Sequence, residues 1–356
     1  MNYQLRLERV RESLKLFSCE ALLVENPINL LYLTGLELSA GKLIISSNAA
    51  CLIVDGRYEE LSKKQSLYPT YLIKENFLRD WIVDVQIHQL GFDQSQTTYQ
   101  DYLSLAQMSE KLKMQSYSLD IVPLDSPIQK LRMIKDHDEI EYLRKAAHLG
   151  YKGYEYASSL LSEGILESEI ALELEFFWKK KGASRLAFDS IIAFGPNSSM
   201  PHYRAGSSIL TMNSTVLIDI GVVLSHYHSD MTRVLFFGTP APIMKTIYAI
   251  VQEAKMAAMN LCRPGTLIGD LDLAARDHIA SKGYGEYFTH SLGHGVGLEI
   301  HEPPLIRDKG PYRAMPLQKG MVITIEPGIY LPGVGGVRLE DTILITDEGY
   351  ENLSLS

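Results

Sequence analysis

The spacing of apolar and polar residues predicts an alternation of helices and strands in the first third of the chain. Between Leu5 and Phe17, apolar residues recur at helical intervals, which is typical of an amphipathic helix. The apolar run 21–25 and the longer stretch 42–55 have the composition of one strand and a strand pair, and the charged segment 57–65 favours a helix. This alternation predicts a small α/β domain.

A proline-containing stretch, Val122-Pro-Leu-Asp-Ser-Pro127, ends this region. Two prolines so close together interrupt regular structure, so we expect a linker here and divide the chain into domains at 1–124 and 125–356. A long helix should begin soon afterwards, because Asp136 can cap it, Glu139 completes a capping box and apolar residues follow at helical spacing.

The second domain contains an internal repeat. One helix is expected between Gly164 and Gly182, and another between Gly265 and Gly283, with the same spacing of the two glycines. Each helix carries lysine near its C-terminus and glycine just beyond it, which suits the helix dipole and a left-handed cap. We therefore expect two duplicated helix-and-sheet halves that meet at a shared centre.

Each half also places two carboxylates in or beside apolar strands. The first half carries Asp219, with isoleucine on both sides, and Asp230; the second carries Glu326, after Ile-Thr-Ile, and Glu340. An unpaired buried charge costs several kcal/mol, so these acids need a partner. The nearby Arg338 alone cannot neutralise four acids, whereas two divalent cations can.

A histidine between two glycines, His294, is the best single imidazole ligand, because glycine lets the backbone approach a ligand closely. His290 and His301 lie in the same stretch, and Pro201-His-Tyr203 follows the corresponding helix in the first half. Four carboxylates and one imidazole suit two divalent ions, for which we expect Mn²⁺, with Co²⁺ or Zn²⁺ as alternatives. Two such ions can share a hydroxide, lower its pKa and polarise a carbonyl.

A second histidine pair, His226 and His228, has the His-x-His spacing of residues on one strand face. Both lie where the strands of Asp219 and Asp230 would turn. We therefore expect both histidines to be exposed to solvent and to bind no metal.

Composition narrows the class of protein further. The chain of 356 residues has a net charge of −9 and no long basic block, which argues against nucleic-acid and anionic-membrane partners. We see no apolar run that could span a bilayer and no secretory signal at the start. The three cysteines, Cys19, Cys51 and Cys262, are far apart; we expect all three to be buried and the protein to be cytoplasmic.

These motifs resemble those of the creatinase, prolidase and aminopeptidase P group, the pita-bread metallopeptidases. The likeness covers nearly the whole chain. It rests on Asn26-Pro-Ile-Asn29, Asp55-Gly-Arg-Tyr58, Leu131-Arg-Met-Ile-Lys-Asp136, Gly293-His-Gly295, Ile325-Glu-Pro-Gly328 and Arg338-Leu-Glu-Asp341. The resemblance implies an α/β N-terminal domain followed by an α+β pita-bread catalytic domain with an internal pseudo-twofold repeat.

The resemblance also implies a ligand set for a dinuclear centre. By analogy, Asp219 binds one metal ion, His294 and Glu326 bind the other, and Asp230 and Glu340 bridge the two. Glu326 would in addition handle the proton of the nucleophilic water.

The same analogy gives roles to residues around the ligands. His202 and His301 would contact the substrate and stabilise the developing oxyanion. His290 would line the pocket, and Tyr330 and Arg338 would support the bridging carboxylates from behind.

The group acts on peptides with proline in the second position. Our first expectation is an Xaa-Pro aminopeptidase, which releases the N-terminal residue; the alternative is a prolidase, restricted to Xaa-Pro dipeptides. Many prolidases of the group carry an arginine soon after the His-Glu-x-Pro segment, where it holds the substrate carboxylate. This chain has Leu305 there and Arg307 two residues later, which favours the aminopeptidase.

Other members of the group fit less well. Methionine aminopeptidases usually lack the N-terminal domain, creatinase works without metal, and non-catalytic binding modules on this fold usually lose ligands, whereas this chain keeps all five. Proline-containing peptides are thus the expected substrates, and the analogy adds a homodimer or higher homo-oligomer.

Overall fold

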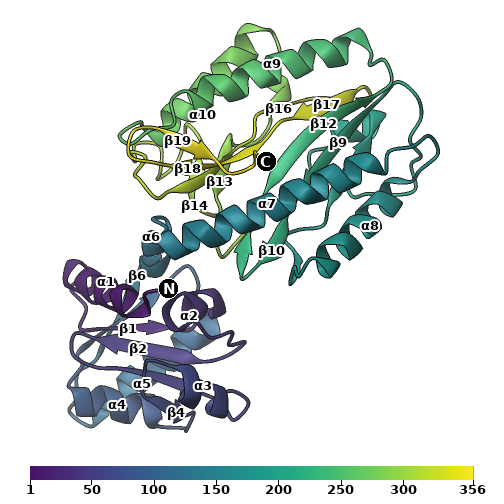
Figure 1. Cartoon of the computed structure of the whole chain (residues 1–356). Helices are drawn as coiled ribbons and strands as arrows, with labels where there is room; N and C mark the ends of the chain where they lie inside the picture. Colours follow the sequence, from purple (N-terminus) through teal and green to yellow (C-terminus); the bar gives the residue numbers. More distant parts are fainter. Residues whose placement is uncertain (356) are drawn as a thin grey trace. The chain divides into compact units, whose positions relative to one another are not determined.

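The computed structural model describes residues 1–355, which form two compact units, Met1–Arg132 and a second that begins at Met133. The domain boundary predicted after residue 124 lies inside the first unit. Each unit has a core of its own and is described by itself below (Figure 1).

The first unit is a six-stranded mixed sheet with helices on both faces. The strand order is β4-β3-β2-β1-β5-β6; β1 is parallel to β5, and β5 to β6, whereas β2 is antiparallel to both of its neighbours. Helices α1, α2 and α6 contact one another, and α4 and α5 pack their apolar residues on the sheet. The strands are β1 (Ala21–Val24), β2 (Lys42–Ser46), β3 (Ala50–Val54), β4 (Thr70–Leu72), β5 (Gln89–Asp93) and β6 (Asp120–Leu124); the helices are α1 (Tyr3–Leu16), α2 (Pro27–Thr34), α3 (Glu59–Gln65), α4 (Phe77–Val85), α5 (Tyr99–Met114) and α6 (Pro127–Arg132).

The expected linker at 122–127 is wrong, because regular structure runs through both of its prolines. Pro123 lies in β6, paired with Phe92 of β5, and Pro127 is the first residue of α6. Since β6 is the edge of the sheet, the missing N–H of Pro123 breaks no ladder to a further strand. Proline is equally well tolerated in the first turn of a helix.

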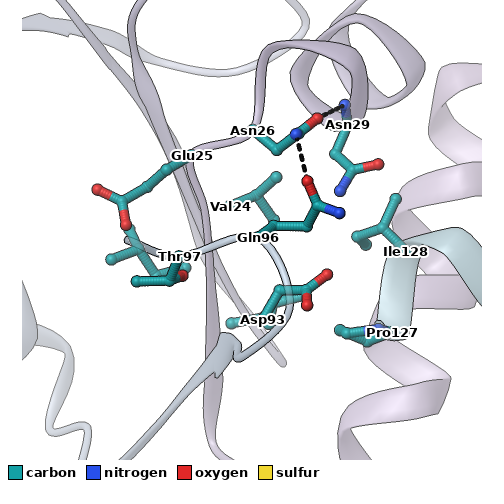
Figure 2. Close-up of a pocket in the computed structure, with 11 residues that line it drawn as sticks. Val24, Glu25, Asn26, Asn29, Asp93, Gln96, Thr97, Pro127 and Ile128 are labelled. Carbon is teal, nitrogen blue, oxygen red and sulfur yellow. Dashed lines mark hydrogen bonds between the residues drawn. The ribbon is translucent and has the colours of Figure 1, made fainter. Parts of the chain in front are cut away.

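A small pocket lies where the parallel strands β1 and β5 end (Figure 2). Asn26 organises it: Oδ1 accepts hydrogen bonds from the backbone N–H groups of Ile28 and Asn29, and Nδ2 donates to Gln96 Oε1 at 2.7 Å. The cavity is about 20 Å³, which holds one water-sized occupant. Asn26 is thus a helix cap that also ties the β1 and β5 ends together.

The second unit sandwiches a set of curved sheets between two helix pairs, α7 with α8 and α9 with α10 (Figure 1). Its sheets have the orders β11-β10-β7, β12-β9-β8, β14-β13-β15-β18-β19 and β16-β17. The helices are α7 (His137–Ser159), α8 (Glu167–Lys180), α9 (Pro242–Met259) and α10 (Ile268–Ser281), with 3-10 turns η1 (Gly195–Ser199) and η2 (Gly285–Tyr287). The strands are β7 (Arg185–Leu186), β8 (Ile191–Phe194), β9 (Ser214–Ile220), β10 (Val222–Leu224), β11 (Tyr227–His228), β12 (Met231–Phe237), β13 (Gly293–Gly295), β14 (Glu302–Ile306), β15 (Val322–Ile325), β16 (Gly328–Leu331), β17 (Gly335–Arg338), β18 (Asp341–Ile345) and β19 (Tyr350–Asn352).

The predicted repeat and caps are confirmed. Helices α8 and α10 have 14 residues each and occupy equivalent positions after Gly164 and Gly265. Gly182 and Gly283, just beyond the two helices, have φ of 92° and 87°, a left-handed conformation that disfavours side chains. The capping box at the start of α7 is present as predicted.

Among the described residues, no helix combines the length and the apolarity needed to cross a membrane. The three cysteines are buried free thiols, as expected.

Candidate metal centre

The four predicted acids and His294 line one cavity of the second unit, with a volume of about 360 Å³. Asp219 is the next-to-last residue of β9, and Asp230 directly precedes the antiparallel partner β12. Glu326 directly follows β15, and Glu340 directly precedes its partner β18. Each half therefore supplies one acid from the end of a strand and one from the start of its neighbour.

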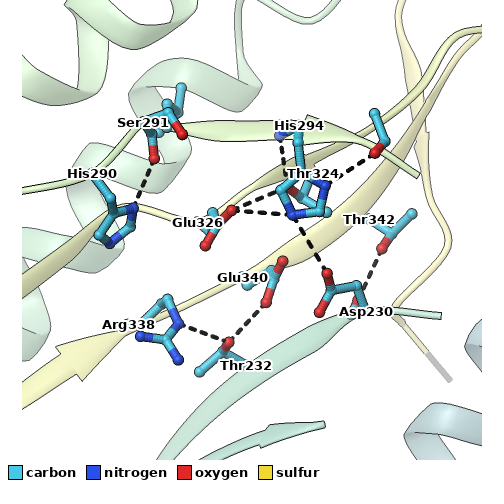
Figure 3. A network of polar contacts seen from close by, with 12 residues as sticks. Asp230, Thr232, His290, Ser291, His294, Thr324, Glu326, Arg338, Glu340 and Thr342 are labelled. Carbon is cyan, nitrogen blue, oxygen red and sulfur yellow. Dashed lines mark hydrogen bonds and ion pairs between the residues drawn. The ribbon is translucent and has the colours of Figure 1, made fainter. Parts of the chain in front are cut away.

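His294 faces this cluster from β13. Its Nδ1 lies 3.0 Å from Gly295 O, so Nδ1–H donates to that carbonyl and Nε2 keeps a free lone pair. Nε2 points at the acids, 3.6 Å from Asp230 Oδ2 and 3.5 Å from Glu326 Oε1 (Figure 3). Burial lowers the pKa of His294 to about 4, so the ring is neutral at physiological pH. This tautomer and charge state suit a metal ligand.

The buried acids carry more negative charge than their surroundings balance. Burial, together with the charge of neighbouring acids, raises the pKa of Asp230 and Glu326 well above the usual range and that of Glu340 to about 8. In the absence of a cation, the cluster therefore tends to keep protons. Asp219 Oδ1 is also buried and has no hydrogen-bond partner.

Arg338 is the cation closest to the cluster. Its Nη2 donates to Asp219 Oδ2, its Nη1 donates to Tyr330 Oη at 2.7 Å, and its Nε donates to Thr232 Oγ1 at 3.2 Å. Thr232 Oγ1 in turn donates to Glu340 Oε2 at 2.7 Å. Arg338 thus contacts one acid directly and a second through one hydroxyl, while Tyr330 contacts the arginine and not a carboxylate.

The predicted substrate histidines lie at the same cavity. His202, His290 and His301 all line it. His290 donates from Nδ1 to Ser291 O at 2.8 Å and accepts at Nε2 from Tyr330 Oη at 2.9 Å. Burial lowers the pKa of His290 to about 4, which fits this neutral, accepting ring.

The expectation that His226 and His228 are both exposed is not met, because His226 is half-buried, and it is clearly wrong for His228. That residue is buried, and its backbone N–H and Nδ1 lie 2.9 Å and 3.1 Å from Gly297 O. The β10–β11 hairpin packs on α7 and brings His228 against a segment far along the chain. Local turn position could not reveal that contact.

Several residues around the cavity were missed by sequence reasoning. Thr232 links Arg338 to Glu340, and Thr342 Oγ1 donates to Asp230 O at 2.9 Å. Both threonines come two residues after a predicted acid, so the repeat itself could have indicated them. Phe188 and Ile191 form part of the apolar wall, and no motif in the sequence indicated them.

The donors fit divalent metal ions. Ligand atoms of Asp230, His294 and Glu340 lie within 4.8 Å of one another, and an unpartnered oxygen of Asp219 adds a further donor in the same cavity. A cation would offset the mutual repulsion of the acids and leave the neutral imidazole unprotonated. Carboxylates and imidazole together are typical of Mn²⁺, Co²⁺ and Zn²⁺ sites.

A duplicated pita-bread fold with such a centre defines a metallopeptidase. The family model of metallopeptidase family M24 matches residues 141–347, and the model of the creatinase/prolidase N-terminal domain matches residues 6–134. The chain belongs to metallopeptidase family M24, so the family, fold and enzyme class predicted from the sequence are confirmed.

Relatives and solved structures agree with this assignment over the full length. The Xaa-Pro dipeptidase of Pyrococcus furiosus is 38% identical over 350 residues, which covers 98% of this chain and 97% of that protein. The structure of an Xaa-Pro dipeptidase from Bacillus anthracis has a TM-score of 0.92 at 35% identity and covers 100% and 98% of the two chains. The structure of an X-Pro aminopeptidase from Thermotoga maritima has a TM-score of 0.86 at 30% identity and covers 97% of this chain and 98% of that chain.

Proposed function

We propose that this protein is an Xaa-Pro dipeptidase, a prolidase. The observation that carries the proposal is the full-length similarity to Xaa-Pro dipeptidases in both sequence and structure. It favours the dipeptidase, the alternative of the sequence analysis, over the aminopeptidase that Leu305 suggested. The intact set of acids and histidines around one cavity supports catalysis over a binding role.

The proposed centre holds two divalent ions. Asp219 would hold one ion, His294 and Glu326 would hold the other, and Asp230 and Glu340 would be shared between them. Support comes from the grouping of Asp230, His294 and Glu340 and from the distance of 3.5 Å between His294 Nε2 and Glu326 Oε1. We place Mn²⁺ first among the ions because carboxylate oxygens outnumber the single imidazole.

Bound divalent ions would supply the acidity that turns water into a nucleophile at neutral pH. Glu326 takes the proton of that water and delivers it to the amine that leaves. His202 and His301, at the same cavity, donate hydrogen bonds to the carbonyl oxygen as it gains negative charge. Arg338 and Tyr330 keep Asp219 and His290 in place.

The cavity suits a small substrate with a proline ring. Its volume of about 360 Å³ is at the small end of ligand pockets. Phe188, Ile191 and Leu305 give it an apolar wall that can pack against the ring, while the acids and histidines form the polar part.

A second candidate, the Xaa-Pro aminopeptidase, is favoured by one observation. Leu305 lines the cavity where many prolidases carry an arginine for the substrate carboxylate. Arg307 is exposed, does not line the cavity, and donates from Nε to Lys309 O at 3.1 Å. The cavity therefore lacks an arginine in either position for the carboxylate of a dipeptide.

Two further proposals concern the protein in the cell. The three free thiols support a reducing compartment, and we place the protein in the cytoplasm. A homodimer follows from the family resemblance and is tested by light scattering of the purified protein.

One experiment distinguishes Xaa-Pro dipeptidase activity from Xaa-Pro aminopeptidase activity. The Mn²⁺-loaded protein is incubated with an Xaa-Pro dipeptide and with an Xaa-Pro-Xaa tripeptide, and Glu326→Gln serves as the inactive control. Cleavage of the dipeptide alone is expected; cleavage of the tripeptide would replace the proposal by an aminopeptidase, and cleavage of neither would reject both. Leu305→Arg should raise kcat/KM for the dipeptide above that of the unsubstituted protein, because it adds a cation for the terminal carboxylate.

A further inference from the structure

A buried ion pair lies near the metal centre but outside the set of residues that line its cavity. Lys135 Nζ is 2.8 Å from Glu302 Oε1, and the two side chains are only 1% and 2% exposed. Lys135 directly precedes the cap of α7, and its backbone N–H donates to Gly320 O at 2.9 Å. A buried ion pair adds little net stability over an apolar pair of similar size, so its location is the informative feature.

Glu302 is joined to the segment Gly295–His301, here called the histidine loop. Glu302 follows His301 directly and pairs with Gly295 across a bulge between β13 and β14. Its carboxylate packs inside the loop: a Cβ on Gly297 would lie 2.5 Å from Glu302 Oε1, and the N–H of Glu299 lies 3.4 Å from Oε2. Lys135 therefore holds the carboxylate around which the loop is folded.

His228 holds the same loop from the other half of the unit. Its backbone N–H and its Nδ1 both lie within hydrogen-bond distance of Gly297 O, at 2.9 Å and 3.1 Å. His228 is buried in β11 and does not line the cavity. The histidine loop is thus anchored at Gly297 by His228 and at its C-terminal end by Lys135.

The loop connects two histidines of the proposed site. The rings of His294 and His301 are 4.3 Å apart and almost perpendicular, at 78°. His294 has support of its own, because it lies in β13 and its N–H donates to Thr324 Oγ1 at 3.1 Å. His301 is exposed at the end of the loop, so its position depends on how that end is anchored.

We propose that the Lys135–Glu302 ion pair and the His228–Gly297 hydrogen bonds form a clamp that positions His301 over the metal centre. Lys135, Glu302 and His228 are positioning residues, which act through His301 and not on the substrate. The clamp rests on the proposed function, since it assumes that His301 contacts the substrate. Loosening the loop displaces His301 and weakens its contact with the carbonyl oxygen, and small misplacements of this kind reduce rates by about 100-fold.

A double-mutant cycle tests the clamp. Lys135→Met removes the charge but keeps the length of the side chain, and we expect kcat/KM for an Xaa-Pro dipeptide to fall by about 100-fold. In a His301→Ala background the same substitution should have almost no further effect, because its target is gone. The Mn²⁺ affinity of Lys135→Met should stay within about threefold of that of the unsubstituted protein, since the hydrogen bonds that orient the proposed metal ligands remain. The control is Lys152→Met, which breaks an exposed pair with Glu155 on α7.

Two further measurements keep the test independent of folding and of the assumed reaction. His228→Leu should give a smaller defect of the same kind, because the backbone N–H of residue 228 still donates to Gly297 O, and His228→Asn should restore activity, because the Asn amide can place a donor where Nδ1 was. Hydrogen–deuterium exchange at residues 295–302 should accelerate in Lys135→Met, but not at α10. An unchanged exchange rate would overturn the clamp, as would an equal loss of activity with and without His301. Failure of the wild-type protein to cleave either peptide would reject the proposed function alone, because exchange still reports on the clamp.

Discussion

The two halves of the catalytic unit share a frame but differ in what they bring to the cavity. Both begin with a 14-residue helix, α8 or α10, and continue to an antiparallel strand pair with two acids. The second half adds His294, the glycine-flanked loop and Arg338. The first half adds Thr232, whose hydroxyl reaches Glu340 Oε2, whereas its counterpart Thr342 reaches only a backbone carbonyl.

This difference distinguishes the side chains that both halves share through duplication from those that only one half carries. Duplication places four acids symmetrically around one cavity. The imidazole proposed as a metal ligand, the arginine and the longer glutamate side chains come from the second half only, whereas His202 of the first half lines the cavity as a proposed substrate contact. The halves should therefore respond differently to matched substitutions.

The largest difference is expected between Glu326 and its counterpart Asp219. Glu326→Gln should reduce kcat for an Xaa-Pro dipeptide by about 10³-fold with an unchanged fold, because the amide cannot accept the water proton. Asp219→Asn should show its defect mainly as weaker Mn²⁺ binding. Steady-state kinetics with a titration of Mn²⁺ distinguish the two, and an active Glu326→Gln protein would refute the role of Glu326 as a base.

A smaller difference is expected between the two threonines. Thr232→Val removes the hydroxyl that joins Arg338 to Glu340 and should weaken Mn²⁺ binding by roughly 10-fold or more. Thr342→Val removes one bond to a backbone carbonyl and should reduce stability by about 1 kcal/mol. Calorimetric Mn²⁺ titrations and urea unfolding of both variants measure this; equal metal affinities would contradict the asymmetry.

Removal of the metal should make stability depend on pH. The pKa of Glu340 is raised to about 8 in the metal-free fold, so between its usual range and that value the folded protein holds a proton that the unfolded chain has lost. Stability of the metal-free protein should therefore fall as pH rises from about 5 to about 8. The gap between melting temperatures in Mn²⁺ and in EDTA should widen by several degrees over this interval. Glu340→Gln should make the EDTA profile less steep without flattening it, because the pKa values of Asp230 and Glu326 are raised as well; an equally steep profile in that variant would assign the effect to those acids alone.

The smallest effect is expected at the glycines that follow helices α8 and α10, where the two halves should behave alike. Gly182 and Gly283 have positive φ, and a Cβ at either position would meet no atom within 4 Å. Alanine at each should therefore cost about 1 kcal/mol through backbone strain alone. Urea unfolding compares the two variants, and a clear inequality would mean that one helix end contributes more to the fold than the other.

Features set by local chemistry could be predicted from the sequence. The capping box of Asp136 and Glu139, the glycine-terminated helices and the paired strands depend on neighbours a few residues away. The acids were also identifiable, because charged residues between isoleucines need compensation wherever they lie. The residues brought to one cavity are the ones that the repeat and the Gly-His-Gly segment indicated.

Features set by distant partners could not be predicted. Pro123 was assigned to a linker because the sequence does not tell that β6 is an edge strand, where proline is tolerated. His228 looked like a turn residue because its partner, Gly297, lies in another part of the chain. Leu305 pointed to an aminopeptidase, whereas the full-length similarity to Xaa-Pro dipeptidases supports our proposal of a dipeptidase, and a single sequence does not contain that comparison.

The hydrogen bonds that join β12 to β18 have a consequence for the order of events during synthesis. Glu340 N–H donates to Thr232 O, and Thr342 Oγ1 donates to Asp230 O, so each half completes the other at the centre. A nascent chain exposes Asp219 and Asp230 long before Glu326 and Glu340 leave the ribosome. Those two acids alone lack His294 and the two glutamates of the second half, so the proposed metal site is incomplete until that half has been made. With the proposed ligand set, metal loading would therefore report that the whole catalytic unit has folded.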